Sequence, residues 1–209
     1  MGKKHKIKKN KKDDKKDKKS TFTLASKNGC HTGQEPIFTT SDGVTVYAGG
    51  KNRQGGWHVM NPYPDLAIGP SETLGGKYSG GTTVPKGFTC DAYVEKPPLL
   101  ISLDWPDFSI PYVPKEFWYA LVADIKVHGF KRVSTQCAGG HGRTGVQLAI
   151  LAFLMMPEHR DLWPTTYHLI EWVRDKHCVH AVEAKSQQEY IAEVCDLPMG
   201  ESAIHTYKT

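Results

Sequence analysis

Apolar residues in the second half of the chain repeat with the periods of strands and helices. Residues 99–103 are almost entirely apolar, which predicts a strand buried on both faces of a parallel sheet. Between Pro114 and Gly129 the apolar positions recur every four residues, and this spacing predicts an amphipathic helix that ends at the glycine. The recurring positions are Phe117, Leu121 and Ile125.

The same alternation continues toward the C-terminus. A strand is predicted at 130–136, and a glycine-rich stretch at 137–145 leads into an apolar helix that runs to about residue 156. Two further helices are predicted at about 164–176 and 184–195. Alternating strands and helices favour an α/β fold.

Residues 20–98 have a different composition. They are rich in Gly, Thr and Tyr, and short β-prone runs such as 44–47 are interrupted by pairs of glycines, so we expect irregular β structure there. The pattern as a whole predicts one domain over 20–197, a disordered lysine-rich tail at 1–19 and a C-terminal tail at 198–209.

Positive charge is concentrated in the first 19 residues. They hold 11 of the 27 basic residues and 3 of the 22 acidic ones, so the rest of the chain is mildly acidic although the whole carries +5. This balance leaves nucleic acid or an anionic surface as a partner of the tail alone. No apolar run is long enough to span a membrane. Five widely spaced cysteines indicate thiols in a reducing compartment, so we expect the cytoplasm, or the nucleus of a eukaryotic host.

The glycine-rich stretch carries the candidate chemistry. Cys137 and Arg143 bracket five residues, of which three are glycines. Glycines let the backbone curl so that successive N–H groups converge on one anion, and the start of a helix adds partial positive charge. A guanidinium pairs with two phosphate oxygens at once, and the same field favours the thiolate form of a cysteine. The loop therefore predicts a phosphate site with Cys137 as its nucleophile.

Two segments resemble a known enzyme family. Cys137, Arg143 and Thr144 have the spacing of the signature loop of the cysteine-dependent protein tyrosine and dual-specificity phosphatases, and residues 105–111 closely resemble the mobile acid loop of that family. The resemblance covers about 99–195. It implies a central, mostly parallel sheet flanked by helices, and hydrolysis of phosphomonoesters through a phosphocysteine intermediate without metal or cofactor. Further similar positions are Arg174, residues 181–183, Gln187 and Gln188.

The resemblance assigns a role to each of the principal residues. Cys137 would attack phosphorus while Arg143 binds the phosphate oxygens. Asp107 would protonate the leaving group and later deprotonate the attacking water, with Asp104 as the alternative acid. An acid of this kind is useful for poor leaving groups such as tyrosine, so the expected substrate is phosphotyrosine in proteins, with phosphoserine and phosphothreonine also open.

Supporting roles follow from the same resemblance. Thr144 would donate a hydrogen bond to the sulfur, and either Gln187 or Gln188 would place the hydrolytic water. His141 lies within the loop, where substrate contact or exposure is a simpler interpretation than a role as base. The residues expected to bind the phosphate are Ala138, Gly139, Gly140, His141, Gly142 and Arg143.

The sequence departs from the family pattern at two points. The family usually has His immediately before the nucleophile, where this chain has Gln136. A tyrosine-bearing substrate loop is also not found, because residues 51–53 resemble it only faintly and Gln54 stands where the aromatic residue should be. The depth of the pocket, and hence the choice between phosphotyrosine and dual specificity, stays open.

Other interpretations apply to the remaining cysteines and histidines. His177, Cys178 and His180 are close enough in sequence to suggest zinc, although packing and surface roles fit them better without a fourth ligand. Cys178 or Cys195 would form a disulfide with an oxidised Cys137 if the distance allowed it.

Two rival functions use the same loop. An RNA 5′-phosphatase would also use the lysine-rich tail, but a triphosphate releases a stable leaving group and leaves Asp107 idle. A non-catalytic phosphate-binding module would be expected to lack the cysteine, the arginine or the acid, and all three are present. The oligomeric state is not predicted.

Overall fold

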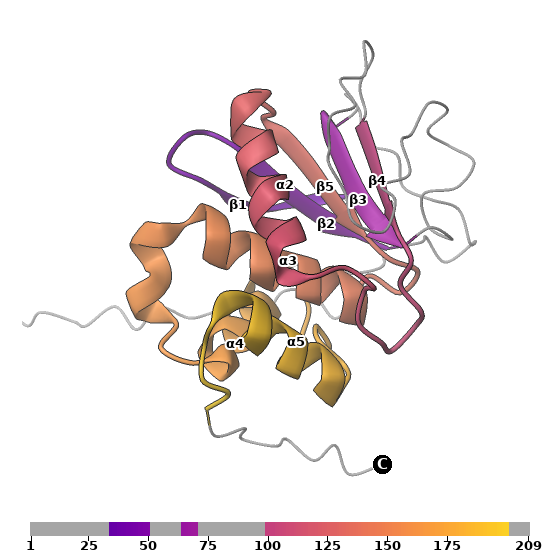
Figure 1. Ribbon diagram of the computed structural model, residues 1–209, viewed down its shortest axis with the longest axis vertical. Helices are drawn as coiled ribbons and strands as arrows, with labels where there is room; N and C mark the ends of the chain where they lie inside the picture. The colour runs from indigo at the N-terminus through magenta and orange to yellow at the C-terminus, as the bar shows by residue number, and fades with distance from the viewer. Residues whose placement is uncertain (1–33, 51–63, 71–98, 201–209) are drawn as a thin grey trace, which may run out of the picture.

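The computed structural model describes residues 34–50, 64–70 and 99–200 (Figure 1). Its five strands form a single sheet in the order β1-β2-β5-β3-β4, in which β1 is antiparallel to β2 and every other pair is parallel. The strands are β1 (Glu35–Thr39), β2 (Thr45–Gly49), β3 (Leu66–Pro70), β4 (Leu99–Leu103) and β5 (Arg132–Gln136). The fold is therefore α/β with a mostly parallel sheet, as predicted.

In the described part of the chain, four α-helices follow β4 and β5 where the apolar periods predict them, and a short 3₁₀ helix that was not predicted lies among them. They are α2 (Lys115–Val127), α3 (Gly142–Met155), the 3₁₀ helix η2 (Pro157–Leu162), α4 (Thr166–Lys176) and α5 (Lys185–Cys195). Pro114 lies just before α2 rather than in its first turn, and Gly129 ends that helix with a left-handed φ of +67°. Every residue of α3 is buried, because this helix contacts the sheet and also α2, α4 and α5.

Burial along the strands explains how the sheet is held. Leu66 and Ile68 of β3 and Ile101 of β4 belong to the main apolar core, which the helices cover. Ala67 and Leu100 point to the opposite face and form a second buried pair. The prediction that residues 99–103 form a strand buried on both faces is confirmed.

Parallel pairing brings three connections to one edge of the sheet. Because β2, β5 and β4 run in the same direction, the residues that follow them, Gly50, Cys137 and Asp104, lie at the edge formed by the carboxyl ends. Ligands of open α/β sheets bind at this edge. The topology thus places the glycine-rich loop and residues 105–111 on the same side of the molecule.

The described residues between 34 and 70 form three strands of this sheet, and the pairing of β1 with β2 shifts register between Pro36 and Phe38. β2 pairs with β5 and β3 lies between β5 and β4, so strands from residues 20–98 occupy interior positions. At the other end, Pro198 and Met199 accept hydrogen bonds from the first N–H groups of α4, although the sequence assigns them to the C-terminal tail. The tail 1–19 and residues 51–54 lie outside the described residues. The described helices include none that is long and apolar enough to cross a membrane.

Candidate active site

The loop between β5 and α3 is organised around the sulfur of Cys137. The N–H of Gly140 donates to Cys137 Sγ at 3.2 Å, and the cysteine is 3% exposed. Gly140 has a φ of +74°, which lets the backbone turn back toward the sulfur. The carbonyl of His141 accepts from the N–H of Gly145 at 2.7 Å, so α3 starts within the loop and directs its N-terminus at it.

Arg143 joins this loop to the segment that follows β4. One terminal nitrogen donates to the carbonyl of Trp105 at 2.9 Å, and the other pairs with Asp107 Oδ1 at 3.1 Å. The arginine side chain is 2% exposed and the aspartate side chain 62% exposed. The predicted acid residue therefore lies against the predicted phosphate ligand, and the salt bridge of Arg143 is to Asp107 rather than to Asp104.

The acid loop itself is anchored by Trp105. This buried side chain donates from Nε1 to the carbonyl of Ser109 at 2.8 Å, which closes the loop around Asp107. Phe108 has a left-handed φ of +53°, and its side chain is 62% exposed. A non-glycine residue rarely adopts this conformation, so the loop holds Phe108 in a strained position beside the acid.

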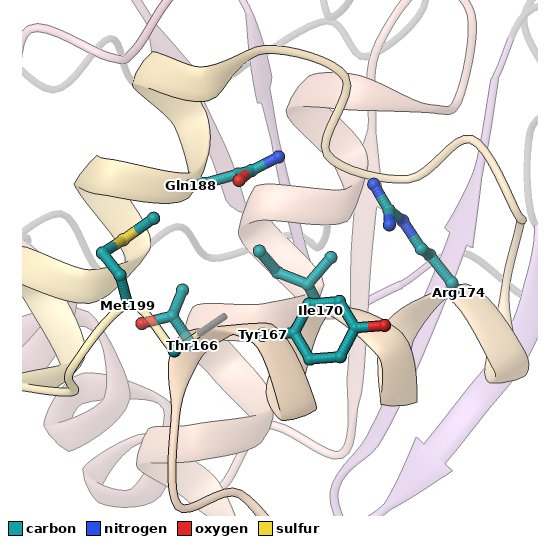
Figure 2. Close-up of a pocket in the computed structure, with 7 residues that line it drawn as sticks. Thr166, Tyr167, Ile170, Arg174, Gln188 and Met199 are labelled. Atoms are coloured by element: carbon teal, nitrogen blue, oxygen red, sulfur yellow. The ribbon is translucent and has the colours of Figure 1, made fainter. Parts of the chain in front are cut away.

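The two adjacent glutamines lie in different places. Gln187 is fully buried, accepts from the N–H groups of Glu183 and Ala184 at 2.9 and 3.2 Å, and donates to the carbonyl of Ser109 at 3.3 Å. It therefore bridges the start of α5 and the acid loop. Gln188 instead lines a pocket between α4 and α5 (Figure 2). The other residues that line this pocket are Thr166, Tyr167, Ile170, Arg174, Met199 and Gly200.

Glu183 is a site residue to which the sequence analysis gave no role. Its Oε2 accepts from the N–H of Gly142 at 3.0 Å, although the two residues are 41 positions apart. A methyl group added to Gly142 would lie 2.5 Å from that oxygen. In the sequence, Glu183 is notable only as part of residues 181–183, which resemble a segment of the phosphatase family.

Two glycines allow the backbone around the loop to pack closely. A Cβ at Gly50 would lie 2.7 Å from the backbone nitrogen of Gly140, and a Cβ at Gly145 would lie 2.7 Å from that of Val182. Both contacts involve backbone atoms, which cannot move aside as a flexible side chain can. The loop is thus confined by the end of β2 on one side and by the turn before α5 on another.

The hydroxyl of Thr144 is buried, and within the described part of the chain it has no hydrogen-bond partner. The hydrogen bond to the sulfur that the resemblance implies is therefore not among the contacts of Thr144 in this structure. Gln136, which stands in place of the usual histidine, is also buried, and its side chain accepts from Gln34 at 3.4 Å.

Residues 94–196 match the family model described as protein-tyrosine phosphatase. This part of the chain, just under half of its length, is thus similar to the protein-tyrosine phosphatases. The matched range includes both the acid loop and the cysteine loop, and also α5 with Gln187.

The chain is also similar to two curated proteins and to several solved structures. Two uncharacterised proteins of Methanocaldococcus jannaschii, MJECL20 and MJ0215, are 39% and 38% identical over 89 residues, which is 42% of this chain. These matches cover 53% and 49% of the relatives, so the chain spans about half their length. The structure of Tk-PTP in its active form is 21% identical with a TM-score of 0.49, over 78% of this chain and 96% of that one. The tyrosine phosphatase OH1 of Orf virus is 14% identical with a TM-score of 0.43, over 82% and 92%.

Residues at and after the end of α4 lie against the cysteine loop. His177 donates from Nε2 to the carbonyl of Gly140 at 2.6 Å, and burial lowers its pKa below the usual 6.5. His141 Nδ1 lies 3.1 Å from the sulfur of Cys178, and this contact raises the pKa of His141. Cys178 also accepts from the N–H of His180 at 3.4 Å.

These contacts bear on the zinc and disulfide interpretations. Among the described residues, no three His, Cys, Asp or Glu side chains are grouped as a metal site requires. Cys178 contacts His141 of the cysteine loop. Cys195 instead belongs to the apolar core, where burial raises its pKa to about 12. Disulfide formation with Cys137 stays a prediction for Cys178, and the core position of Cys195 makes that residue an unreactive thiol.

Proposed function

We propose that this chain hydrolyses phosphomonoesters, with phosphotyrosine in proteins as the main substrate, through a phosphocysteine intermediate. The observation that carries the proposal is the position of Arg143, which contacts the acid loop at Trp105 and Asp107 while its own loop surrounds Cys137. The proposed nucleophile and anion ligand, on one loop, thus lie together with the proposed acid, on a second stretch of sequence, at the carboxyl edge of the sheet.

The first chemical step forms the intermediate. The thiolate of Cys137 attacks phosphorus, the new S–P bond forms, and the ester P–O bond breaks. Asp107, in its protonated form, transfers its proton to the leaving oxygen, so the product leaves as a neutral alcohol or phenol. Arg143 then contacts phosphate oxygens in place of the Asp107 carboxylate and stabilises the charge that redistributes over them.

The second step regenerates the thiolate. A water molecule attacks the phosphorus of phosphocysteine and gives its proton to the Asp107 carboxylate, while the S–P bond breaks and inorganic phosphate is released. Gln187 is suited to position this water because it bridges the acid loop and the turn at 183–184. Gln188 is not, since it lies in the pocket between α4 and α5.

The acid loop favours an aromatic ester. Phe108 directly follows the acid and is 62% exposed in a strained conformation, so an apolar ring is presented next to the reacting group. A phenyl ring packs well against such a side chain, whereas a serine or threonine phosphate offers little apolar surface. We therefore rank phosphotyrosine above phosphoserine and phosphothreonine, and above an RNA 5′-triphosphate.

The test combines trapping with a substrate panel. Rapid mixing with a phosphotyrosine peptide, followed by acid quenching and intact-mass measurement, is expected to show one phosphoryl group on Cys137. Cys137→Ser should remove both that adduct and turnover. Turnover in the panel should decrease from phosphotyrosine peptide to phosphothreonine peptide to RNA 5′-triphosphate. Full activity of Cys137→Ser, or a preference for the RNA, would contradict the proposal.

A further inference from the structure

A side-chain carboxylate of the protein accepts a hydrogen bond from one of the backbone N–H groups of the cysteine loop. Gly142 is the first residue of α3, and its N–H has no acceptor within the helix, as is usual for the first turn. No side chain at the helix start caps it, because the residue before it is His141. The acceptor is instead Glu183 Oε2 at 3.0 Å.

The turn before α5 holds Glu183 in this place against a conformational cost. Val182 has a left-handed φ of +60°, a rare conformation for a β-branched residue. Arg174 stabilises the turn by donating from Nε to the carbonyl of Ala181 at 3.1 Å and from a terminal nitrogen to that of Val182 at 3.3 Å. Gly145 provides the space for the turn to pack on α3. In Figure 2 the guanidinium of Arg174 points from α4 toward the segment that leads into α5.

The position of this carboxylate has a consequence for anion binding. The N–H of Gly142 lies between His141 and Arg143, within the stretch expected to bind phosphate, and Asp107 already pairs with Arg143. A phosphate dianion that uses the Gly142 N–H has to displace Glu183. A dianion that does not use it still binds close to a negative charge, which opposes binding. Either way, the charge of Glu183 weakens the hold of the loop on phosphate.

We propose that Glu183 limits the affinity of the cysteine loop for phosphate, and thereby promotes release of the inorganic phosphate that the reaction produces. The inference rests on the proposed function for the origin of that phosphate. Its structural part concerns anion affinity alone, which can be measured without turnover. In this scheme Glu183 sets the affinity of the loop for phosphate, and it acts neither as a proton donor nor as a nucleophile.

The test measures binding of inorganic phosphate by calorimetry to the full chain and to Glu183→Gln and Glu183→Ala. We expect both variants to bind phosphate about tenfold more tightly, since a charge-assisted contact that competes with the ligand is lost. In turnover assays the inhibition constant for phosphate should fall by the same factor, while kcat does not rise. Glu189→Gln is the matched control: this residue lies on α5, pairs with Lys185 at 3.3 Å, and changes the net charge equally.

The possible results separate the two proposals. Unchanged or weaker phosphate binding in both Glu183 variants would overturn the inference and make the residue a structural cap of α3. The same tenfold gain in Glu189→Gln would also overturn it, because the effect would be one of net charge. Measured in a Cys137→Ser background, a gain in affinity supports the inference even if the chain fails to hydrolyse phosphotyrosine, and that failure would count against the proposed function only.

Discussion

The cysteine loop has two sides that differ in burial and charge. Toward the acid loop and the turn before α5 its contacts include two exposed carboxylates: Asp107 on Arg143, and Glu183 on the N–H of Gly142. On the other side its contacts are close backbone packing at Gly50 and a buried histidine hydrogen bond. An exposed carboxylate can exchange its partner for water, whereas buried packing cannot adjust. The carboxylates to which we assign functions are thus separate from the contacts that fix the shape of the loop.

The largest effect expected from this separation is on Asp107. Asp107→Asn should lower kcat for a phosphotyrosine peptide by about 10²–10⁴, because the leaving group then departs without a proton. The free energy of unfolding should change by less than about 0.5 kcal/mol, because the side chain is 62% exposed. Kinetics at several pH values and urea unfolding would measure the two quantities.

Asp104→Asn is the control for that experiment. Asp104 is also an exposed residue of the same loop, and the described contacts of Arg143 do not include it. Its substitution should leave kcat within about threefold of the wild type. A large loss with Asp104→Asn and none with Asp107→Asn would transfer the acid role to Asp104.

How much of the site can be predicted from the sequence depends on how far apart in the sequence the contacting residues lie. Residues 137–145 contain a cysteine, glycines and an arginine in one stretch, so their position between a strand and a helix could be predicted, and the chemistry proposed for them stays a prediction. Glu183 could not be assigned its contact with Gly142, because the two meet only through packing of the turn at 181–183 on α3. Likewise, Gln187 and Gln188 are neighbours in sequence, and only the packing of α5 decides which one is buried.

The interior strands of residues 20–98 illustrate the same limit. β2 and β3 are each five residues long and are separated from β5 by long stretches of chain, and their pairing with β5 depends on neither local period nor composition. A run such as 44–47 predicts a strand but not its partner. The glycine pair at the end of β2 is informative only once the structure brings Gly50 against Gly140.

The next effects concern the shape of the loop. Gly50→Ala and Gly145→Ala each place a methyl group 2.7 Å from a backbone nitrogen, so each should lower the free energy of unfolding by about 1–3 kcal/mol. Activity should fall as well, since Gly140, which Gly50 contacts, also donates to the sulfur of Cys137. Urea unfolding monitored by tryptophan fluorescence gives the stability. Wild-type stability in both variants would show that the loop is not confined as described.

Gln187 is buried, yet it contacts the acid loop, so its substitution should affect both stability and catalysis. Gln187→Ala removes the acceptor for two N–H groups and the donor to Ser109, so we expect a loss of about 1–3 kcal/mol in stability and a slower hydrolysis of the phosphocysteine intermediate. Gln188→Ala is the matched control, with a change below about 0.5 kcal/mol because this residue is only half-buried. A larger kinetic effect for Gln188→Ala would reverse the assignment of the water-positioning residue.

The smallest effect expected is a pH dependence from the buried side of the loop. Burial lowers the pKa of His177 below 6.5, so below that pH the unfolded chain binds a proton that the folded chain does not, and stability falls as the pH decreases. His177→Gln retains a donor for the carbonyl of Gly140 and cannot titrate. The difference in unfolding free energy between pH 7.5 and pH 5 should therefore be smaller in this variant than in the wild type.

His141 has a raised pKa from its contact with Cys178 and contributes in the opposite sense, so His141→Gln should make the same difference larger. Equal pH dependence in all three proteins would show that neither histidine couples the loop to protons.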